Sequence, residues 1–226
     1  MKEVGNFLKL ILQENDTIVA AISGGPDSMC LLNILVALKH EYNLKIICAH
    51  VNHGLRIESS DEAKFVEQYC QDNNIIFEYK IIEKYKNDKF SEYEARNIRY
   101  SFFKQLVKKY HAKYLMTAHH GDDLIETILM RLVRGSNLKG YLGIPIITKC
   151  DGYDMIRPLL FVTKDEIVKY LDKNNIKYVI DKSNDSDLYT RNRFRKQMLP
   201  SLKKESENVH LKFLEFSEEL QSYLDF

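Results

Sequence analysis

Short apolar runs alternate with longer amphipathic segments along the chain, a pattern that few folds can satisfy. The runs with strand character are Thr17–Ile22, Lys45–Val51, Ile75–Ile82 and Lys113–Thr117, with a weaker one at Tyr153–Pro158. Apolar residues recur at three- and four-residue spacing in Asp27–Lys39, Glu58–Asp72, Glu92–Tyr110 and Asp122–Arg134. Repeated strand–helix units form a mostly parallel sheet, because right-handed crossovers place the helices over its two faces. The sequence therefore predicts a doubly wound α/β fold.

Three polar loops directly follow predicted strands, at Ser23–Ser28, His50–Arg56 and His119–Asp123. In open parallel sheets, ligands bind at the edge formed by the carboxyl ends of the strands. We therefore expect these three loops to lie along one edge of the sheet and to build the functional site there.

Composition limits the kind of protein. The 226 residues are enough for one domain with a large core, with or without an appendage. The net charge is only +1, so a nucleic-acid surface must come from local clusters of Lys and Arg. No apolar run approaches the roughly 20 residues of a membrane span, and the amphipathic first segment contains acidic residues, unlike a secretory signal. We expect a cytoplasmic protein without membrane contact, whose unpaired cysteines are reduced thiols.

The pattern changes after Arg134. Residues 135–154 are Gly-rich and irregular, and we expect a linking loop there. Thr163 and Glu166 then form a predicted capping box for a helix, and residues 181–190 read as an ordered polar loop. A last amphipathic helix is predicted from about Glu205.

The stretch Ser23–Ser28, with sequence SGGPDS, joins the first predicted strand to the helix that follows. Glycines let backbone amides approach an anion closely, and the positive end of the following helix faces that anion. Pro26 suits the first turn of a helix, where Asp27 can reach a metal ion and Ser28 a phosphate oxygen. The stretch is neither a Walker A loop nor a Rossmann GxGxxG motif.

SGGPDS resembles the SGGxDS signature of the PP-loop ATP pyrophosphatase superfamily, whose fold is of the adenine nucleotide alpha hydrolase type. The resemblance implies that ATP is cut between its α- and β-phosphates to activate a substrate oxygen as an adenylate. The superfamily includes GMP synthetase, NAD synthetase, argininosuccinate synthetase, tRNA thiolases and tRNA(Ile)-lysidine synthetase.

Further segments narrow the resemblance to one family. They are HVNHGLR (50–56), EARNIRYSFF (94–103), TAHHGDDLIETILMRLVRGS (117–136), IRPLL (156–160) and DKSNDSDLYTRNRFRKQMLP (181–200). Together with SGGPDS they resemble the N-terminal catalytic domain of the tRNA(Ile)-lysidine synthetase family. The resemblance implies that ATP and Mg²⁺ serve to join the ε-amine of L-lysine to C2 of the wobble cytidine of tRNA(Ile) with a CAU anticodon.

Other readings remain open. A PP-loop tRNA thiolase would use paired cysteines, and this chain has no CxxC. A small-molecule ligase such as NAD synthetase would not need the basic segment near the end of the chain. An inactive RNA-binding remnant of the fold would not need to keep SGGPDS and DDLIET.

Candidate ATP-site residues follow from the motifs. The resemblance places ATP against Ser23, Gly24, Gly25, Pro26, Asp27, Ser28, His53 and His119. The family arrangement HxxDDxxET falls here on His119, Asp122, Asp123, Glu126 and Thr127. We expect Asp27 and Asp123 to act in catalysis and to hold Mg²⁺, with Arg96 of the matched ARNIRY segment as a third catalytic residue. The alternative is that the acids only stabilise a helix N-terminus, by ~0.3–1 kcal/mol each.

Basic residues form the candidate tRNA surface. Six Lys and Arg residues and no acid lie between Arg191 and Lys204. We expect tRNA contacts from Arg134, Arg191, Arg193 and Arg195, although a solvated charged surface is the alternative reading.

The predicted organisation is a catalytic domain at residues 1–200 and a C-terminal helical extension at 201–226. Familiar lysidine synthetases carry one or two further domains, so this extension is expected to begin a linker to domains absent from this sequence. Whether the sequence is a fragment or a minimal form, and its oligomeric state, stay open.

Overall fold

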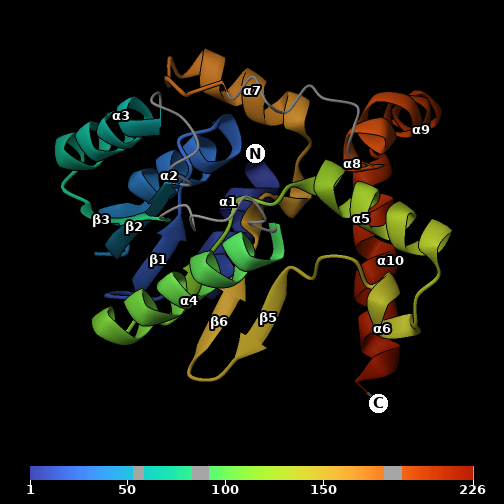
Figure 1. Cartoon of the computed structure of the whole chain (residues 1–226), viewed down its shortest axis with the longest axis horizontal. Helices are drawn as coiled ribbons and strands as arrows, with labels where there is room; N and C mark the ends of the chain where they lie inside the picture. Colours follow the sequence, from blue (N-terminus) through green and yellow to red (C-terminus); the bar gives the residue numbers. More distant parts are fainter. Residues whose placement is uncertain (53–58, 83–91, 181–189, 226) are drawn as a thin grey trace.

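The computed structural model describes residues 1–52, 59–82, 92–180 and 190–225. A six-stranded sheet with the order β3-β2-β1-β4-β6-β5 forms its centre (Figure 1). The strands are β1 (Thr17–Ala21), β2 (Lys45–Asn52), β3 (Ile76–Ile81), β4 (Tyr114–Met116), β5 (Ile147–Cys150) and β6 (Tyr153–Ile156). All neighbouring pairs are parallel except β5 with β6. The predicted doubly wound, mostly parallel α/β fold is confirmed.

Helices cover both faces of the sheet because successive residues of β1 point to opposite sides. Ile18 and Ala20 pack with α1 (Lys2–Ile11), α2 (Pro26–Lys39), α3 (Ser59–Asp72) and α7 (Lys164–Lys173). Val19 packs on the other side, against α4 (Glu92–Tyr110), which lies across that face in Figure 1. This two-sided burial explains why β1 is a continuous apolar run in the sequence.

The expectation of an irregular loop at residues 135–154 is wrong in two places. A short helix, α6 (Leu138–Tyr141), and strand β5 both form within it. In the hairpin, Cys150 pairs with Tyr153, so the turn consists of Asp151 and Gly152, and Gly152 has φ +81°. Asp-Gly is a strong signal for a two-residue hairpin turn. β5 is only four residues long and half exposed, so its hydrophobic pattern is weak.

The C-terminal part packs against α5 (Gly121–Arg134). The last helix, predicted from about Glu205, is α10 (Val209–Leu224). It is preceded by α9 (Leu199–Glu205), and α8 (Thr190–Arg193) leads into α9 through a π-helical turn at Phe194–Met198. Leu214 of α10 and Leu124 of α5 belong to one buried cluster, with Leu160 of the 3₁₀ turn η1 (Pro158–Phe161). Residues 201–225 therefore share a core with the helices at the carboxyl edge.

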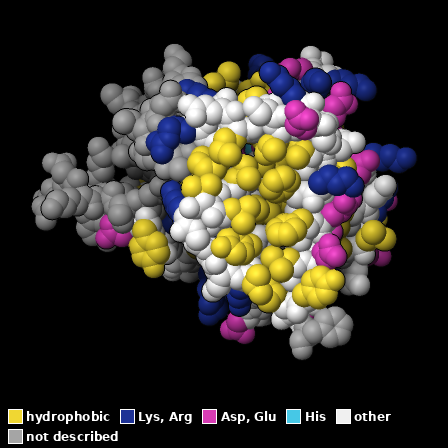
Figure 2. All heavy atoms as spheres, turned by 90° about the vertical axis from the view of Figure 1, so that its right-hand side faces the viewer, with side chains coloured by type: hydrophobic (Ala, Val, Ile, Leu, Met, Phe, Trp, Pro, Cys, Tyr) yellow, Lys and Arg dark blue, Asp and Glu magenta, His cyan; other side chains and the backbone are white. Residues whose placement is uncertain are grey.

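Figure 2 shows hydrophobic side chains gathered on the face that carries these C-terminal helices. Exposed apolar residues of α5, α6 and α10 are Leu132, Val133, Leu138, Phe216, Tyr223 and Leu224. Within the described ranges, none of the helices combines the length and hydropathy that crossing a bilayer requires.

Candidate active site

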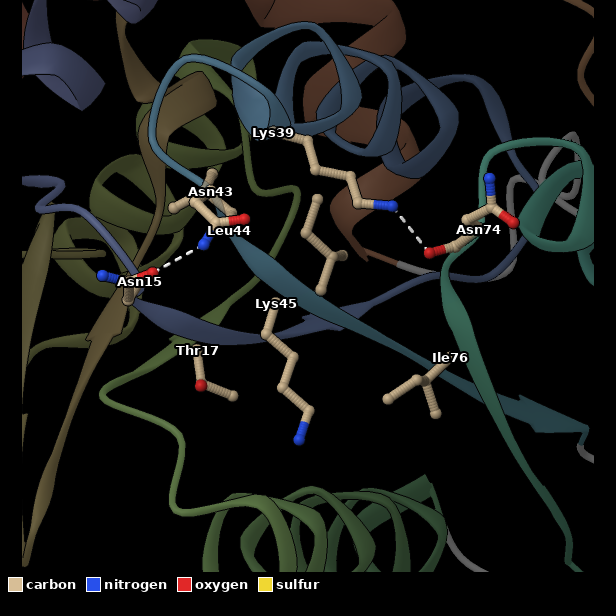
Figure 3. Close-up of a pocket in the computed structure, with 9 residues that line it drawn as sticks. Asn15, Thr17, Lys39, Asn43, Leu44, Lys45, Asn74 and Ile76 are labelled. Atoms are coloured by element: carbon tan, nitrogen blue, oxygen red, sulfur yellow. Dashed lines mark hydrogen bonds between the residues drawn. The ribbon is translucent and has the colours of Figure 1, made fainter.

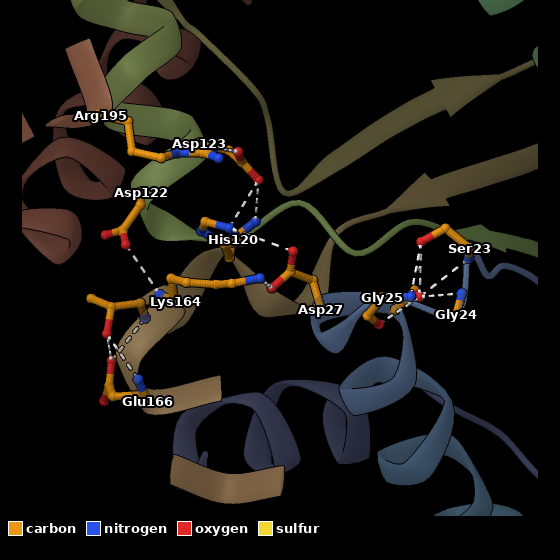
Figure 4. A network of polar contacts seen from close by, with 12 residues as sticks. Ser23, Gly24, Gly25, Asp27, His120, Asp122, Asp123, Lys164, Glu166 and Arg195 are labelled. Atoms are coloured by element: carbon orange, nitrogen blue, oxygen red, sulfur yellow. Dashed lines mark hydrogen bonds and ion pairs between the residues drawn. The ribbon is translucent and has the colours of Figure 1, made fainter. Parts of the chain in front are cut away.

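The turn between β1 and α2 contains Ser23, Gly24 and Gly25 (Figure 4) and is closed by the side chain of Ser28. The backbone amides of Ser23 and Gly24 donate to Oγ of Ser28 at 3.2 and 3.1 Å, and this hydroxyl donates to the carbonyl oxygen of Gly25 at 2.9 Å. Gly24 has φ +89°, and a Cβ there would lie 3.2 Å from Cγ2 of Val66. Glycine therefore permits a tight turn that brings the N-terminus of α2 to the carboxyl edge, where it can bind an anion.

Asp27, in the first turn of α2, extends toward the starts of two other helices. Its Oδ1 lies 2.5 Å from Nζ of Lys164, the first residue of α7, and its Oδ2 lies 3.9 Å from Nε2 of His120, which precedes α5. Figure 4 shows both side chains pointing at the Asp27 carboxylate. The N-termini of α2, α5 and α7 thus converge on one acidic group.

His120 lies between two carboxylates. Its buried ring has Nε2 3.5 Å from Oδ2 of Asp123 and 3.9 Å from Oδ2 of Asp27. The backbone amide of His120 donates to Oδ2 of Asp123 at 3.2 Å, which fixes the first turn of α5. Burial alone would raise the pKa of Asp123, but the neighbouring His120 and His119 hold that pKa below its ordinary value. Asp123 is therefore an anion at neutral pH.

Asp122 makes different contacts from Asp123, although the two are adjacent. Its Oδ2 accepts hydrogen bonds from the backbone amide of Lys164 at 3.1 Å and from Nζ of Lys203 at 2.9 Å. The side chain is almost fully buried. Asp122 therefore ties the start of α5 to α7 and α9, while Asp123 faces Asp27 across His120.

Glu126 lies one turn further along α5 and is only 1% exposed. Nε of Arg195 is 2.7 Å from its Oε1, and Nε of Arg191 is 3.3 Å from its Oε2. Burial raises the pKa of Glu126 above its ordinary value, and Arg195 and Arg191 oppose that rise. Basic and acidic groups therefore alternate in one continuous row, called the charged row below. Its members, in order, are Lys164, Asp27, His120, Asp123, Arg195, Glu126 and Arg191.

His119 lies beside this row with its Nδ1 2.9 Å from Oγ1 of Thr117. Burial lowers the pKa of His119 to about 4, and the cationic Arg157, Arg191 and Arg96 contribute to the lowering. The ring is therefore neutral at pH 7.

Arg157 and Arg96 add further positive charge near His119. Arg157 is 8% exposed and donates to the carbonyl oxygen of Pro145 at 2.6 Å and to Oγ1 of Thr148 at 2.9 Å. Among the described residues no carboxylate lies within ion-pair distance of Arg157, and burial lowers its pKa. The exposed Arg96 guanidinium stacks over the ring of Tyr100 at 4.8 Å.

Not every predicted site residue belongs to this group. Arg134 is the last residue of α5, and the ~1.5 Å rise per helical residue places it roughly 16 Å along the axis from Asp123. Arg193 is an exposed residue of α8. His53 lies outside the described residues.

Lys164 and Arg157 belong to the site but are missing from the sequence prediction. Both lie in the segment that follows β6 at the carboxyl edge, Arg157 at once and Lys164 after the turn η1. The rule that predicted the other loops, that ligands bind after the ends of parallel strands, applies equally to this segment. For Arg157 the usable signal is the IRPLL segment (156–160) of the family resemblance, which contains it.

The donors present fit a magnesium ion. Asp27 and Asp123 offer carboxylate oxygens that approach one imidazole nitrogen from two sides, and both side chains keep some exposure, 30% and 14%. Mg²⁺ takes oxygen ligands and commonly uses one or two carboxylates together with substrate phosphates. Within the described part of the chain, no group of three or more His, Cys, Asp or Glu residues is arranged to hold a metal by itself.

A separate pocket of about 400 Å³ lies at the opposite, amino edge of the sheet (Figure 3). Its polar groups largely satisfy one another: Lys39 donates to the carbonyl oxygen of Asn74 at 2.6 Å, and Asn43 donates to Asn15 at 2.6 Å. It contains no carboxylate, histidine or cysteine. This pocket therefore has none of the carboxylate and imidazole groups that gather at the carboxyl edge.

Comparison with known proteins gives the relatives of the chain. The chain is 44% identical over 228 residues to the tRNA(Ile)-lysidine synthase of Bacillus cereus, covering 98% of this chain and 48% of that protein. It is 41% identical over 227 residues to the enzyme of the same name from Bacillus subtilis, and the match covers 97% of this chain and 48% of that protein. The chain thus spans about half the length of the curated relatives it matches.

A solved structure supports the fold assignment. The U34-tRNA thiolase NcsA from Methanococcus maripaludis, described with its [4Fe-4S] cluster, superposes with a TM-score of 0.81 at 17% identity, covering 97% of this chain and 78% of that one. The family model described as PP-loop domain matches residues 1–202, from the first helix into α9. Because that match includes the Ser23–Ser28 turn and every carboxylate of the charged row, the chain belongs to the PP-loop family.

Proposed function

We propose that this chain is the ATP-using catalytic part of a tRNA(Ile)-lysidine synthase. It would join the ε-amine of L-lysine to C2 of the wobble cytidine in the CAU anticodon of tRNA(Ile), converting ATP to AMP and pyrophosphate. The observation that carries the proposal is the 41–44% identity to lysidine synthases over nearly the whole chain. The charged row beside a phosphate-type loop supports it with suitable chemistry.

In the first step, O2 of the cytidine attacks the α-phosphorus of ATP, and the bond from that phosphorus to the bridging oxygen breaks. Pyrophosphate leaves, and the cytidine is adenylylated. We assign the phosphates to the Ser23–Ser28 turn at the N-terminus of α2, with Asp27 and Asp123 as the residues that would hold Mg²⁺. A bound Mg²⁺ supplies charge neutralisation for the phosphates.

In the second step, Nζ of the substrate lysine attacks C2, and the bond from C2 to the adenylate oxygen breaks to release AMP. The substrate ammonium must first lose a proton. Glu126 and Asp123 are the carboxylates that suit a cationic substrate, and Glu126, with its raised pKa, is the better proton acceptor of the two. The neutral His119 beside them does not repel the amine.

Arg134, Arg191, Arg193 and Arg195 remain the proposed tRNA contacts, and Arg96 the proposed third catalytic residue. For Arg191 and Arg195, contact with a phosphate would replace their contact with Glu126. These two arginines would then release the Glu126 carboxylate when RNA binds.

A tRNA thiolase is the less supported alternative. The four cysteines lie on separate elements: Cys30 on α2, Cys48 on β2, Cys70 on α3 and Cys150 on β5. Burial, with Asp27 nearby, raises the pKa of Cys30 to about 12, and burial also raises that of Cys48. Reactive thiolates require the opposite environment.

Pyrophosphate release from ATP in the presence of unmodified tRNA(Ile), with and without lysine, tests the proposal. We expect release that depends on tRNA(Ile), and AMP release that also requires lysine. Turnover without tRNA would indicate a small-molecule ligase, and no turnover would indicate an RNA-binding remnant.

A further inference from the structure

Among the residues that the structure describes, Lys164 is the nearest cation to Asp27, the acidic residue of the phosphate-binding turn. Its Nζ lies 2.5 Å from Oδ1 of Asp27, across 137 residues of sequence. The two side chains are 38% and 30% exposed, so the pair lies on the wall of the site and is accessible to a ligand.

The backbone of Lys164 is held by hydrogen bonds, while its long side chain reaches the partly exposed Asp27. Its amide donates to Oδ2 of the buried Asp122, and Thr163 and Glu166 close a capping box around the same first turn of α7. The ammonium group, by contrast, is carried on four rotatable bonds and bonded to a partly exposed carboxylate. This arrangement fixes where the cation enters the site and lets it adjust to a bound anion.

The Lys164 ammonium lies where it can offset the repulsion between the Asp27 carboxylate and a bound phosphate chain. The phosphate chain of ATP would approach the N-terminus of α2, where Asp27 stands in the first turn. An unpaired carboxylate there would repel phosphate, and negative charge grows on the departing pyrophosphate as the α–β bond breaks. A lysine ammonium beside Asp27 offsets both effects as a mobile point charge.

We propose that Lys164 binds the β- and γ-phosphates of ATP and the pyrophosphate leaving group. The inference rests on the proposed ATP site and adds to it a residue from α7, outside the SGGPDS motif. In the free protein its ammonium neutralises Asp27; with nucleotide bound it bridges Asp27 and the terminal phosphates. No proton is transferred, and the bond that breaks remains the one between the α-phosphorus and the bridging oxygen.

Equilibrium binding of ATP, AMP and inorganic pyrophosphate to the full chain, in buffer with Mg²⁺, tests this proposal. We expect Lys164→Gln to weaken ATP and pyrophosphate binding by ~10- to 100-fold and AMP binding by less than about twofold, because AMP lacks the terminal phosphates. Lys164→Arg should restore most of the affinity. Lys169→Gln, an exposed residue on another face of α7, is the matched control and should leave all three affinities unchanged.

The binding results distinguish a failure of the proposed Lys164 role from a failure of the proposed function. Lys164→Gln binding ATP and pyrophosphate like the wild type would overturn the role of Lys164 alone. An equal loss of ATP and AMP affinity would also overturn it, because it would mean that Lys164 only organises the pocket. A wild-type chain that binds neither ATP nor pyrophosphate would overturn the proposed function as well.

Discussion

Nε of Arg195 lies 2.7 Å from Oε1 of Glu126, a residue 69 positions earlier in the chain. The contact joins the π-helical turn after α8 to the first half of α5, and it neutralises a carboxylate that is 1% exposed. The basic segment after residue 190 is therefore part of the acidic site and not only a charged surface.

Arg195→Gln should lower the free energy of unfolding by roughly 1–3 kcal/mol, because a buried carboxylate loses its better partner and keeps only Arg191. Urea unfolding of the wild type, of the single variant Arg195→Gln and of the double variant Glu126→Gln/Arg195→Gln measures the effect. The double variant should recover part of the loss, since it removes the buried charge. Lys204→Gln, an exposed cation of α9, is the control and should change stability little. Equal stability of wild type and Arg195→Gln would contradict the pairing.

Asp27→Asn should abolish most adenylate formation and leave the fold intact. The change keeps the size of a partly exposed side chain but removes the negative charge proposed to hold Mg²⁺ and to orient Lys164. Pyrophosphate release and the circular dichroism spectrum should be compared in the same preparation. An adenylation rate near that of the wild type would rule out the assigned role.

Asp122→Asn and Asp123→Asn should separate stability from catalysis. Asp123→Asn should slow adenylation more, because Asp123 faces Asp27 across His120. Asp122→Asn should instead lower the free energy of unfolding more, because this buried carboxylate binds Lys203 and the start of α7. Each is the control for the other, and small, equal effects in both assays would favour a simple helix-terminus role for the acids.

The contribution of His119 to stability should be lost as the pH is lowered from about 6.5 to about 4. The pKa of His119 in the folded chain is about 4, below the value of ~6.5 for an unperturbed histidine, so the unfolded chain binds the proton first on acidification. His119→Gln should flatten this part of the pH–stability profile, and His40→Gln, at an exposed helix end, should not. An identical slope in wild type and His119→Gln would show that the folded pKa is not depressed.

Gly121→Ala should destabilise the contact between α5 and α10 by about 1–3 kcal/mol. A Cβ at residue 121 would lie 2.8 Å from Cβ of the buried His210, with the carbonyl oxygen of Val162 at 3.1 Å. Gly5→Ala in α1 is the matched control, since nothing lies within 4 Å of a Cβ there, and it should be neutral or stabilising. Thermal unfolding of the wild type and of both variants tests this prediction. An unfolding midpoint of Gly121→Ala equal to that of the wild type would contradict the close packing around Gly121.

Binding of tRNA should depend on salt less steeply than the basic segment suggests. The proposed phosphate contacts are four arginines, Arg134, Arg191, Arg193 and Arg195, of which Arg191 and Arg195 would exchange Glu126 for phosphate. Four such contacts give an expected slope of roughly −3.5 in a log–log plot of affinity against salt, compared with about −5 for six contacts. Titrations of whole tRNA and of an anticodon hairpin should give similar affinities. A slope near −5, or strong preference for whole tRNA, would mean that the RNA surface is placed wrongly.

The sheet and the phosphate turn could be predicted because their signals are local. Apolar periodicity marks β1, β2 and α5 within a few residues, and SGGPDS contains its own turn and helix start. Strand β5 could not be found by the same pattern, since a four-residue, half-exposed strand buries too little to show a period. Its Asp151-Gly152 turn was the usable signal.

The partners of the site residues could not be predicted, because they depend on packing between distant elements. The contact between Lys164 and Asp27 requires α7 to lie against α2, and that of Arg195 with Glu126 requires the π-helical turn to reach α5. Neither spacing nor composition contains this information. The sequence therefore predicts only a basic surface, and the contacts of Arg191 and Arg195 with Glu126 appear in the structure alone.

The most direct measurement of the central claim is mass spectrometry of nucleosides from tRNA(Ile) incubated with this chain, ATP, Mg²⁺ and isotopically labelled lysine. The proposed function predicts a cytidine derivative that carries the labelled lysine, formed only at the anticodon, with AMP and pyrophosphate released in equal amounts. Asp27→Asn should give none of it. Release of pyrophosphate without incorporated lysine, or incorporation of sulfur in its place when a sulfur donor is supplied, would contradict the account.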